Sequence, residues 1–208
     1  MTDRFLGIPV TIREQRDASY EVLVGRGALA ELPRVLREAC PAARYAVIAD
    51  HRAAELHGAA LTALLERAGL PATMFQFPSG EWNKSREQWA ELTDQLLAAH
   101  IGRDGAVISF GGGVAGDLAG FVSATYLRGI PYVQVPTTLL AMIDSSIGGK
   151  SGVDVPAGKN LVGAFHQPRA VLADIDLLAS LPRPHIAAGL AEAIKRSEER
   201  RVGKECRL

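Results

Sequence analysis

A glycine-rich stretch near the middle of the chain carries residue types that suit anion binding. Gly111, Gly112 and Gly113 follow the apolar, β-prone residues 106–110, and an amphipathic segment begins near Val114. A strand, a glycine turn and a helix N-terminus in this order let backbone N–H groups and the helix dipole face a phosphate. Glycine matters because a pyrophosphate can approach bare backbone only where no Cβ intervenes. The same pattern also fits a plain tight connection between strand and helix, so alone it does not decide the function.

A second polar cluster follows at residues 150–160. Lys150, Asp154, Lys159 and Asn160 lie in a stretch without helical periodicity, among Gly148, Gly149, Gly152, Pro156 and Gly158. We interpret this stretch as a glycine-rich loop. Two lysines in such a loop fit an anion cradle better than a solvated face.

Four longer motifs resemble those of the 3-dehydroquinate synthase family: GGGVAGDLAGF, TYLRGIPYVQVPTTLLAMIDSSIGGKSGV, GKNLVGAFHQP and GLAEAIK. Their order and spacing also match, and the resemblance covers about residues 5–195. This family belongs to the sugar-phosphate cyclases, which are distantly similar to iron-dependent alcohol dehydrogenases. The resemblance implies that a heptulosonic acid 7-phosphate is transiently oxidised by NAD, loses phosphate, is reduced again and closes by an aldol step to 3-dehydroquinate.

The resemblance also implies a set of NAD-binding residues. Asp50 ends a predicted strand at the sheet edge where ligands of open α/β folds bind, and it would face the adenosine ribose. From the sequence alone, a helix N-cap explains Asp50 equally well. Asp117 suits a helix acid favoured by the dipole, and the family pattern places it beside the nicotinamide half. The implied set is Asp50, Ser79, Gly80, Glu81, Lys84, Gly112, Gly113, Val114, Gly116, Asp117, Thr137, Thr138, Lys150, Lys159, Leu177 and Ser180.

A second implied set would bind a small sugar-acid phosphate and carry the catalysis. Such a substrate needs cations for its carboxylate and phosphate and an amide to orient its hydroxyls. Arg128 fits this role, although it could equally be a cation at a helix C-terminus. The resemblance places Asp144 and Lys159 where substrate and cofactor meet. The implied catalytic residues are Arg128, Asp144, Lys150, Asn160 and Lys195.

Glu192 raises the question of a metal. A glutamate in a helix is usually a solvated charge, but Ala191, Ala193 and Ile194 around it indicate little solvent. In the family, the glutamate of the GLAE motif binds zinc or cobalt together with two later histidines that this sequence does not contain. The five histidines present show no metal-ligand spacing, and we interpret them as structural or surface residues: His51, His57, His100, His166 and His185.

Composition limits the partners and the compartment. The 208 residues hold 23 basic and 23 acidic side chains, and this zero net charge argues against nucleic acid as a partner. No apolar run approaches the ~20 residues that span a bilayer, and the first residues lack a signal pattern. The two cysteines, Cys40 and Cys206, form neither a disulfide framework nor a metal knuckle, so we expect the cytoplasm. The resemblance implies a homodimer for the full-length parent.

The elements that must position these residues alternate between strand and helix. We expect an antiparallel pair at 10–13 and 20–24, then strands at 45–49, 73–77, 106–110, 132–135 and 170–173. Helices are expected at 28–39, 53–68, 89–99, 115–126, 138–143 and from 185. This alternation predicts an α/β, Rossmann-like, mostly parallel sheet with flanking helices, followed by the first helix of a missing α-helical domain.

The C-terminal residues suggest that the chain is a fragment. We expect an NAD-binding domain at 1–181, the start of a truncated helical metal and substrate domain at 182–195, and a foreign tail at 196–208. The tail is charged and has no apolar face, so we expect that it cannot continue the preceding helix and that Ile186, Leu190 and Ile194 stay exposed. The chain alone is then expected to be inactive. The alternatives are another sugar-phosphate cyclase, an iron-type alcohol dehydrogenase or a non-catalytic nucleotide-binding fragment.

Overall fold

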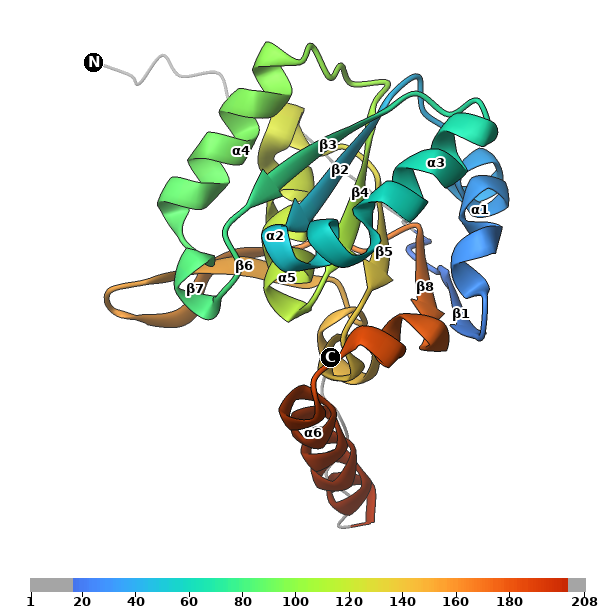
Figure 1. Cartoon of the computed structure of the whole chain (residues 1–208). Coiled ribbons are helices and arrows are strands. Elements are labelled where there is room, and N and C mark those ends of the chain that lie inside the picture. Colours follow the sequence, from blue (N-terminus) through green and yellow to red (C-terminus); the bar gives the residue numbers. More distant parts are fainter. Residues whose placement is uncertain (1–16, 202–208) are drawn as a thin grey trace, which may run out of the picture.

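The chain folds around one parallel, six-stranded β-sheet (Figure 1). The computed structural model describes residues 17–201. In spatial order the strands are β1 (Glu21–Gly25), β8 (Ala170–Asp174), β5 (Tyr132–Pro136), β4 (Ala106–Gly111), β2 (Tyr45–Asp50) and β3 (Ala72–Phe77). Every pairing between these neighbours is parallel, so all their carboxyl ends reach one edge of the sheet.

Helices cover both faces of this sheet. On one face α1 (Leu32–Ala39) and α3 (Ala59–Arg67) bury Leu36 and Leu65 in a core cluster that includes Val47 of β2. On the other face α4 (Arg86–Ala98) and α5 (Gly113–Thr125) pack in a second cluster that includes Ile48. Successive β2 side chains therefore enter opposite cores. A strand buried on both sides reads as a continuous apolar run, which is how the sequence predicted the central strands.

Most expected elements are confirmed, two of them with a π turn inside. The helix expected at 53–68 begins as α2 (His51–Ala53), passes through a π turn, η2 (Ala54–Gly58), and continues as α3. The short helix expected at 138–143 is centred on a second π turn, η5 (Ala141–Ser145). The strand expected at 20–24 is β1, which pairs in parallel with β8. Its expected antiparallel partner at 10–13 lies outside the described residues.

The glycine-rich loop expected at 150–160 was a wrong interpretation. The segment forms an antiparallel hairpin of β6 (Lys150–Val155) and β7 (Gly158–Phe165), which projects beside the sheet (Figure 1). Its glycines serve close backbone approach: a Cβ at Gly163 would lie 2.1 Å from the carbonyl oxygen of Ser151. Glycine inside a strand often marks such an approach rather than a loop.

The final helix also corrects an expectation. Helix α6 spans Arg183–Arg201, so the charged segment continues the helix through Arg201, and residues 202–208 lie outside the described part. Arginine and glutamate are good helix formers, and a helix that leaves the domain surface needs no second buried face (Figure 1). Leu190 and Ile194 are exposed as expected, at 53% and 60%, whereas Ile186 is partly buried. None of the described helices is long and apolar enough to cross a membrane.

One buried carboxylate joins the first and last strands of the sheet at their carboxyl ends. Asp174 ends β8, is 4% exposed, and accepts hydrogen bonds from the backbone N–H groups of Gly27 and Leu29 at 3.0 and 2.9 Å. It also accepts from the N–H of Asp176 at 3.0 Å, which caps the 3-10 helix η6 (Ile175–Ser180). Three backbone donors thus depend on one side chain.

We predict that Asp174→Ala lowers the free energy of unfolding by about 3 kcal/mol, because it removes the charged acceptor shared by three backbone N–H groups. The matched control is Asp176→Ala two residues away, whose half-exposed carboxylate pairs only with the exposed Arg26. That change should cost less than ~1 kcal/mol. Urea denaturation of the three proteins measures both values, and equal costs would contradict the capping role.

Candidate functional site

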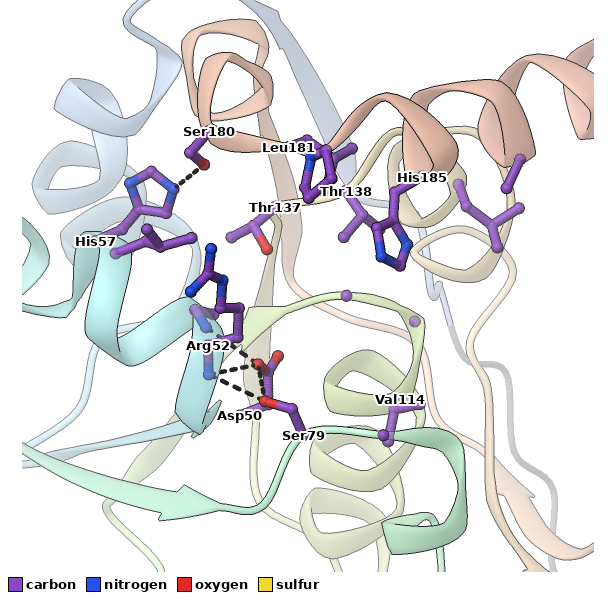
Figure 2. Close-up of a pocket in the computed structure, with 18 of the residues that line it drawn as sticks. Asp50, Arg52, His57, Ser79, Val114, Thr137, Thr138, Ser180, Leu181 and His185 are labelled. Carbon is purple, nitrogen blue, oxygen red and sulfur yellow. Dashed lines mark hydrogen bonds between the residues drawn. The ribbon is translucent and has the colours of Figure 1, made fainter.

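A cavity of about 450 Å³ opens at the carboxyl edge of the sheet (Figure 2). We call it the edge cavity. One wall comes from β2, α2 and η2, the opposite wall from η6 and α6, and the turns after β4 and β5 lie between them. Ten residues of the implied NAD set line it: Asp50, Ser79, Gly80, Glu81, Gly112, Gly113, Val114, Thr137, Thr138 and Ser180.

Asp50 is an N-cap, as one of its two interpretations predicted, and it also lines the edge cavity. Its Oδ1 accepts from the N–H groups of Arg52 and Ala53, each at 3.0 Å, and from the Ser79 hydroxyl at 2.9 Å. Within the described residues, Oδ2 receives no hydrogen bond. One oxygen therefore fixes the side chain, while the other can accept from a ligand hydroxyl.

The glycine turn places bare backbone at the start of α5. Gly111 has φ +155°, and a Cβ there would lie 2.6 Å from Asp50 Oδ2, so a side chain would collide with the carboxylate. Gly112 is the N-cap of α5 and has no side chain to cap the helix. The first N–H groups of this helix therefore receive no side-chain cap, and such uncapped N–H groups suit an anionic ligand.

A second group of predicted residues meets beside the hairpin rather than in the edge cavity. The Lys84 side chain is 4% exposed, and its ammonium pairs with the Asp117 carboxylate and donates to the Asn160 amide oxygen. Burial raises the pKa of Asp117, and the Lys84 ammonium opposes that rise. Asp117, Lys150 and Asn160 line a further cavity of about 350 Å³, which we call the hairpin cavity.

Backbone contacts hold this group together. The N–H of Asp154 donates to the Lys84 carbonyl at 2.7 Å, and the N–H of Asn160 donates to the Asp154 carboxylate at 2.8 Å. Lys159 forms an exposed ion pair with Glu81 at 3.1 Å, which reaches the rim of the edge cavity. The hairpin therefore contacts both cavities.

Three other predicted residues lie outside both cavities. Leu177 belongs to η6 and is buried in the core, and Gly116 packs against Gln134, whose oxygen would lie 2.9 Å from an added Cβ. Arg128 follows the C-terminal end of α5, where it lines a separate cavity of about 570 Å³ with His166 and Arg169. This chain alone does not bring Arg128 to the other predicted substrate residues.

The predicted metal ligand is engaged by cations. Glu192 pairs with Lys195 at 3.3 Å and with Arg196 at 3.4 Å, and Arg196 also pairs with Asp144. Among the described residues no group of three or more histidine, cysteine, aspartate or glutamate side chains could hold a metal ion. The residues present therefore do not by themselves fit a metal.

Sequence reasoning missed part of the edge-cavity lining. His57 and His185 line it, a position that the interpretation of the histidines as structural or surface residues did not specify. Asp50, Ala53 and His57 are spaced three and four residues apart, so helical periodicity could have indicated that they share a face. The other lining residues that were not predicted are Arg52, Ala53, Leu56, Leu140, Leu181, Pro182 and Ala188.

Comparison with known proteins decides the family. The family model described as 3-dehydroquinate synthase N-terminal matches residues 74–188. The chain belongs to the 3-dehydroquinate synthase family. The 3-dehydroquinate synthase of Symbiobacterium thermophilum is 52% identical over 183 residues, covering 88% of this chain and 51% of that protein. The chain thus spans about half the length of the curated relatives it matches.

Two solved structures of sugar-phosphate cyclases are similar to this member of the family. The 2-epi-5-epi-valiolone synthase of Streptomyces hygroscopicus, with NAD+ and Zn2+ bound, superimposes with a TM-score of 0.79 at 33% identity, covering 88% of this chain and 50% of that one. A 2-deoxy-scyllo-inosose synthase complexed with carbaglucose-6-phosphate, NAD+ and Co2+ superimposes with a TM-score of 0.78 at 29% identity. The match covers 85% of this chain and 47% of that one.

The buried Lys84–Asp117 pair generates a pH-dependent prediction. Lys84→Met should cost about 3 kcal/mol near neutral pH, because it leaves the Asp117 carboxylate buried without a cation. Loss of the ammonium raises the Asp117 pKa further, so the folded protein binds a proton that the unfolded chain has released. Stability then falls as pH rises, and the cost should be larger near pH 7.5 than near pH 5.

Urea denaturation of the wild type and the variant at both pH values measures this difference. The control is the double variant Lys84→Met with Asp117→Asn, in which the extra pH dependence should disappear. A cost for Lys84→Met that is the same at both pH values would show that Asp117 does not depend on Lys84.

Proposed function

We propose that this chain supplies the NAD-binding part of a 3-dehydroquinate synthase. The observation that carries the proposal is the edge cavity, which joins an uncapped helix N-terminus to a fixed aspartate with one free oxygen. That arrangement fits a dinucleotide, with its pyrophosphate at the glycine turn and its adenosine ribose at Asp50. The family membership supports the reaction: conversion of 3-deoxy-arabino-heptulosonate 7-phosphate to 3-dehydroquinate and phosphate, a step of aromatic amino acid biosynthesis.

In this proposal the residues of the edge cavity orient the cofactor. The N–H groups after Gly112 face the pyrophosphate, Asp50 Oδ2 accepts from the ribose, and Thr137 and Thr138 border the turn. NAD, when bound, supplies a hydride acceptor that is restored within each turnover and acts as a catalyst. Positioning is the main task of the protein, because each intermediate is set up for the next step.

The hairpin cavity is the proposed place for the sugar-acid phosphate. Lys150 supplies a cation for an anionic group, and the Asn160 amide can orient hydroxyls. Asp117, next to both, would border the nicotinamide end. Arg128, Asp144 and Lys195 stay proposals as substrate residues, as do Gly116 and Leu177 as cofactor residues. Asp144 and Lys195 lie with Glu192 on the α6 side, away from Arg128.

The metal site concerns Glu192 and its neighbours. Glu192 remains a proposed ligand for zinc or cobalt, but the described residues surround it with cations and add no second or third ligand. The domain boundaries at 181 and 195, the origin of residues 196–208, the homodimer and the cytoplasmic location likewise remain predictions.

The main alternative to 3-dehydroquinate synthase is a different sugar-phosphate cyclase activity. The solved inosose and valiolone synthases share the fold at 29% and 33% identity, so a different cyclic product is chemically close. The 52% identity to a curated 3-dehydroquinate synthase favours the heptulosonate substrate.

We predict that NAD raises the melting temperature of the 208-residue chain, because a ligand that binds only the native state stabilises it. Gly112→Val should abolish the shift. Its Cβ would lie 3.2 Å from the Thr138 methyl group, and the branched side chain would fill the space assigned to the pyrophosphate. Gly25→Val, at a strand end with open space around it, is the control. Scanning calorimetry with and without NAD gives the shifts in melting temperature. An undiminished shift in Gly112→Val would show that the pyrophosphate does not bind at this turn.

The proposed substrate site predicts the behaviour of Lys150. In a form of the protein as long as its curated relatives, Lys150→Ala should lower kcat/KM for phosphate release from the heptulosonate phosphate by at least ~10²-fold. Arg34→Ala, which removes exposed ion pairs with Glu31 and Glu38 on the surface of α1, is the comparison. We expect the 208-residue chain alone to release no phosphate, since its described residues hold no metal site. Near-normal turnover by Lys150→Ala would show that this lysine is a solvated surface charge and does not bind the substrate.

A further inference from the structure

A single side-chain hydrogen bond spans the edge cavity. His57 Nε2 lies 2.8 Å from the Ser180 hydroxyl oxygen, although 123 residues separate them (Figure 2). His57 belongs to η2, which follows β2, whereas Ser180 ends η6, which follows β8. In the sheet, β4 and β5 lie between β2 and β8. The bond therefore connects the two walls across the strand ends that carry Gly112 and Thr137.

The direction of this bond follows from the other contact of Ser180. The Ser180 hydroxyl donates its only proton to the Leu177 carbonyl oxygen at 3.0 Å. When the hydroxyl makes this bond it accepts from His57, and the imidazole then carries its proton on Nε2. Burial also lowers the pKa of His57, which favours the neutral ring.

Both partners are held by buried neighbours. The His57 ring meets the ring of Phe110 edge to face, with centroids 6.4 Å apart, and Phe110 is fully buried at the end of β4. Leu177, whose carbonyl binds Ser180, is 7% exposed in the core. Each wall is thus anchored independently, and the hydrogen bond sets the distance between anchored groups.

We propose that His57 is a positioning residue for the dinucleotide: through Ser180 it holds η6 at the separation from η2 that the cofactor needs before it binds. The proposal rests on the NAD site proposed above. Without the bond, the separation of η6 from η2 would have to be set when the ligand arrives, and that cost would appear as weaker binding. His57 lies in the π turn η2, and π turns are frequent at functional sites, which agrees with this role.

Binding measurements on the 208-residue chain test the proposal. Calorimetric titration with NAD and with ADP should show His57→Ala and Ser180→Ala each weakening both ligands by about 5–10-fold, the scale of one hydrogen bond. The double variant should lose no more than either single variant, because both remove the same bond. His57→Gln should retain the affinity, since its amide nitrogen occupies the place of Nε2. His51→Ala, an exposed histidine of α2 outside the cavity lining, is the matched control.

Two readouts without ligand test the bond itself. Long-range ¹⁵N NMR should show the His57 ring protonated on Nε2 and bare on Nδ1. Amide exchange at residues 176–180 should accelerate in His57→Ala and Ser180→Ala but not in His57→Gln or His51→Ala. Unchanged exchange in both alanine variants would overturn the proposal.

The outcomes separate the positioning role from the proposed function. If the wild type binds NAD and the alanine variants bind it equally well, the positioning role fails and the NAD site stands. Additive losses in the double variant would also overturn it, because they would mean that the two side chains act separately. If the wild type binds neither NAD nor ADP, the proposed function fails and the positioning role falls with it.

Discussion

The pairing of β4 with a parallel strand on each side is the constraint on which this molecule depends. Register with β2 sets Phe110 opposite Ala49, and register with β5 sets Gly111 opposite Pro136. The chain after each of these three strands must therefore leave at the same level of the same edge. That is why an aspartate, a glycine turn and a pair of threonines from distant parts of the sequence border one cavity, with no direct bond needed among them.

The ion pairs beside the sheet differ in how far they are buried. Lys84 and Asp117 are shielded from solvent, so each needs the other, and the neutral Asn160 amide takes up a further donor of the ammonium. Lys159 and Glu81 make the same kind of pair in solvent, where such pairs contribute little. The Lys84–Asn160 hydrogen bond and the Lys159–Glu81 pair connect the hairpin to the loop after β3 at two depths. The buried Lys84–Asp117 pair joins the same loop to α5.

Local sequence patterns were sufficient to predict the sheet and the glycine turn. They did not predict the side-chain contacts that join distant elements. The strands are buried on both faces and the turn after β4 is marked by three glycines, so short windows of sequence reveal both. The Asp50 cap is similarly local. The pairs Lys84–Asp117, His57–Ser180 and Arg196–Asp144 join segments that periodicity cannot relate. The hairpin was misread because its glycines are needed by a neighbouring backbone, and α6 was ended too early because an exposed helix needs only propensity.

The crossing of backbones in the hairpin restricts how this sequence can change over evolution. Gly152 and Gly163 face each other, and a Cβ on either would press into the backbone of the other strand. Side chains such as Leu161 and Phe165, which are 64% and 79% exposed, can be exchanged freely without disturbing that contact. Insertion or deletion of one residue in either strand would instead move a side chain into the crossing point. Exposed positions of the hairpin can therefore change without disturbing the contact, whereas the spacing of residues around Gly152 and Gly163 must be kept.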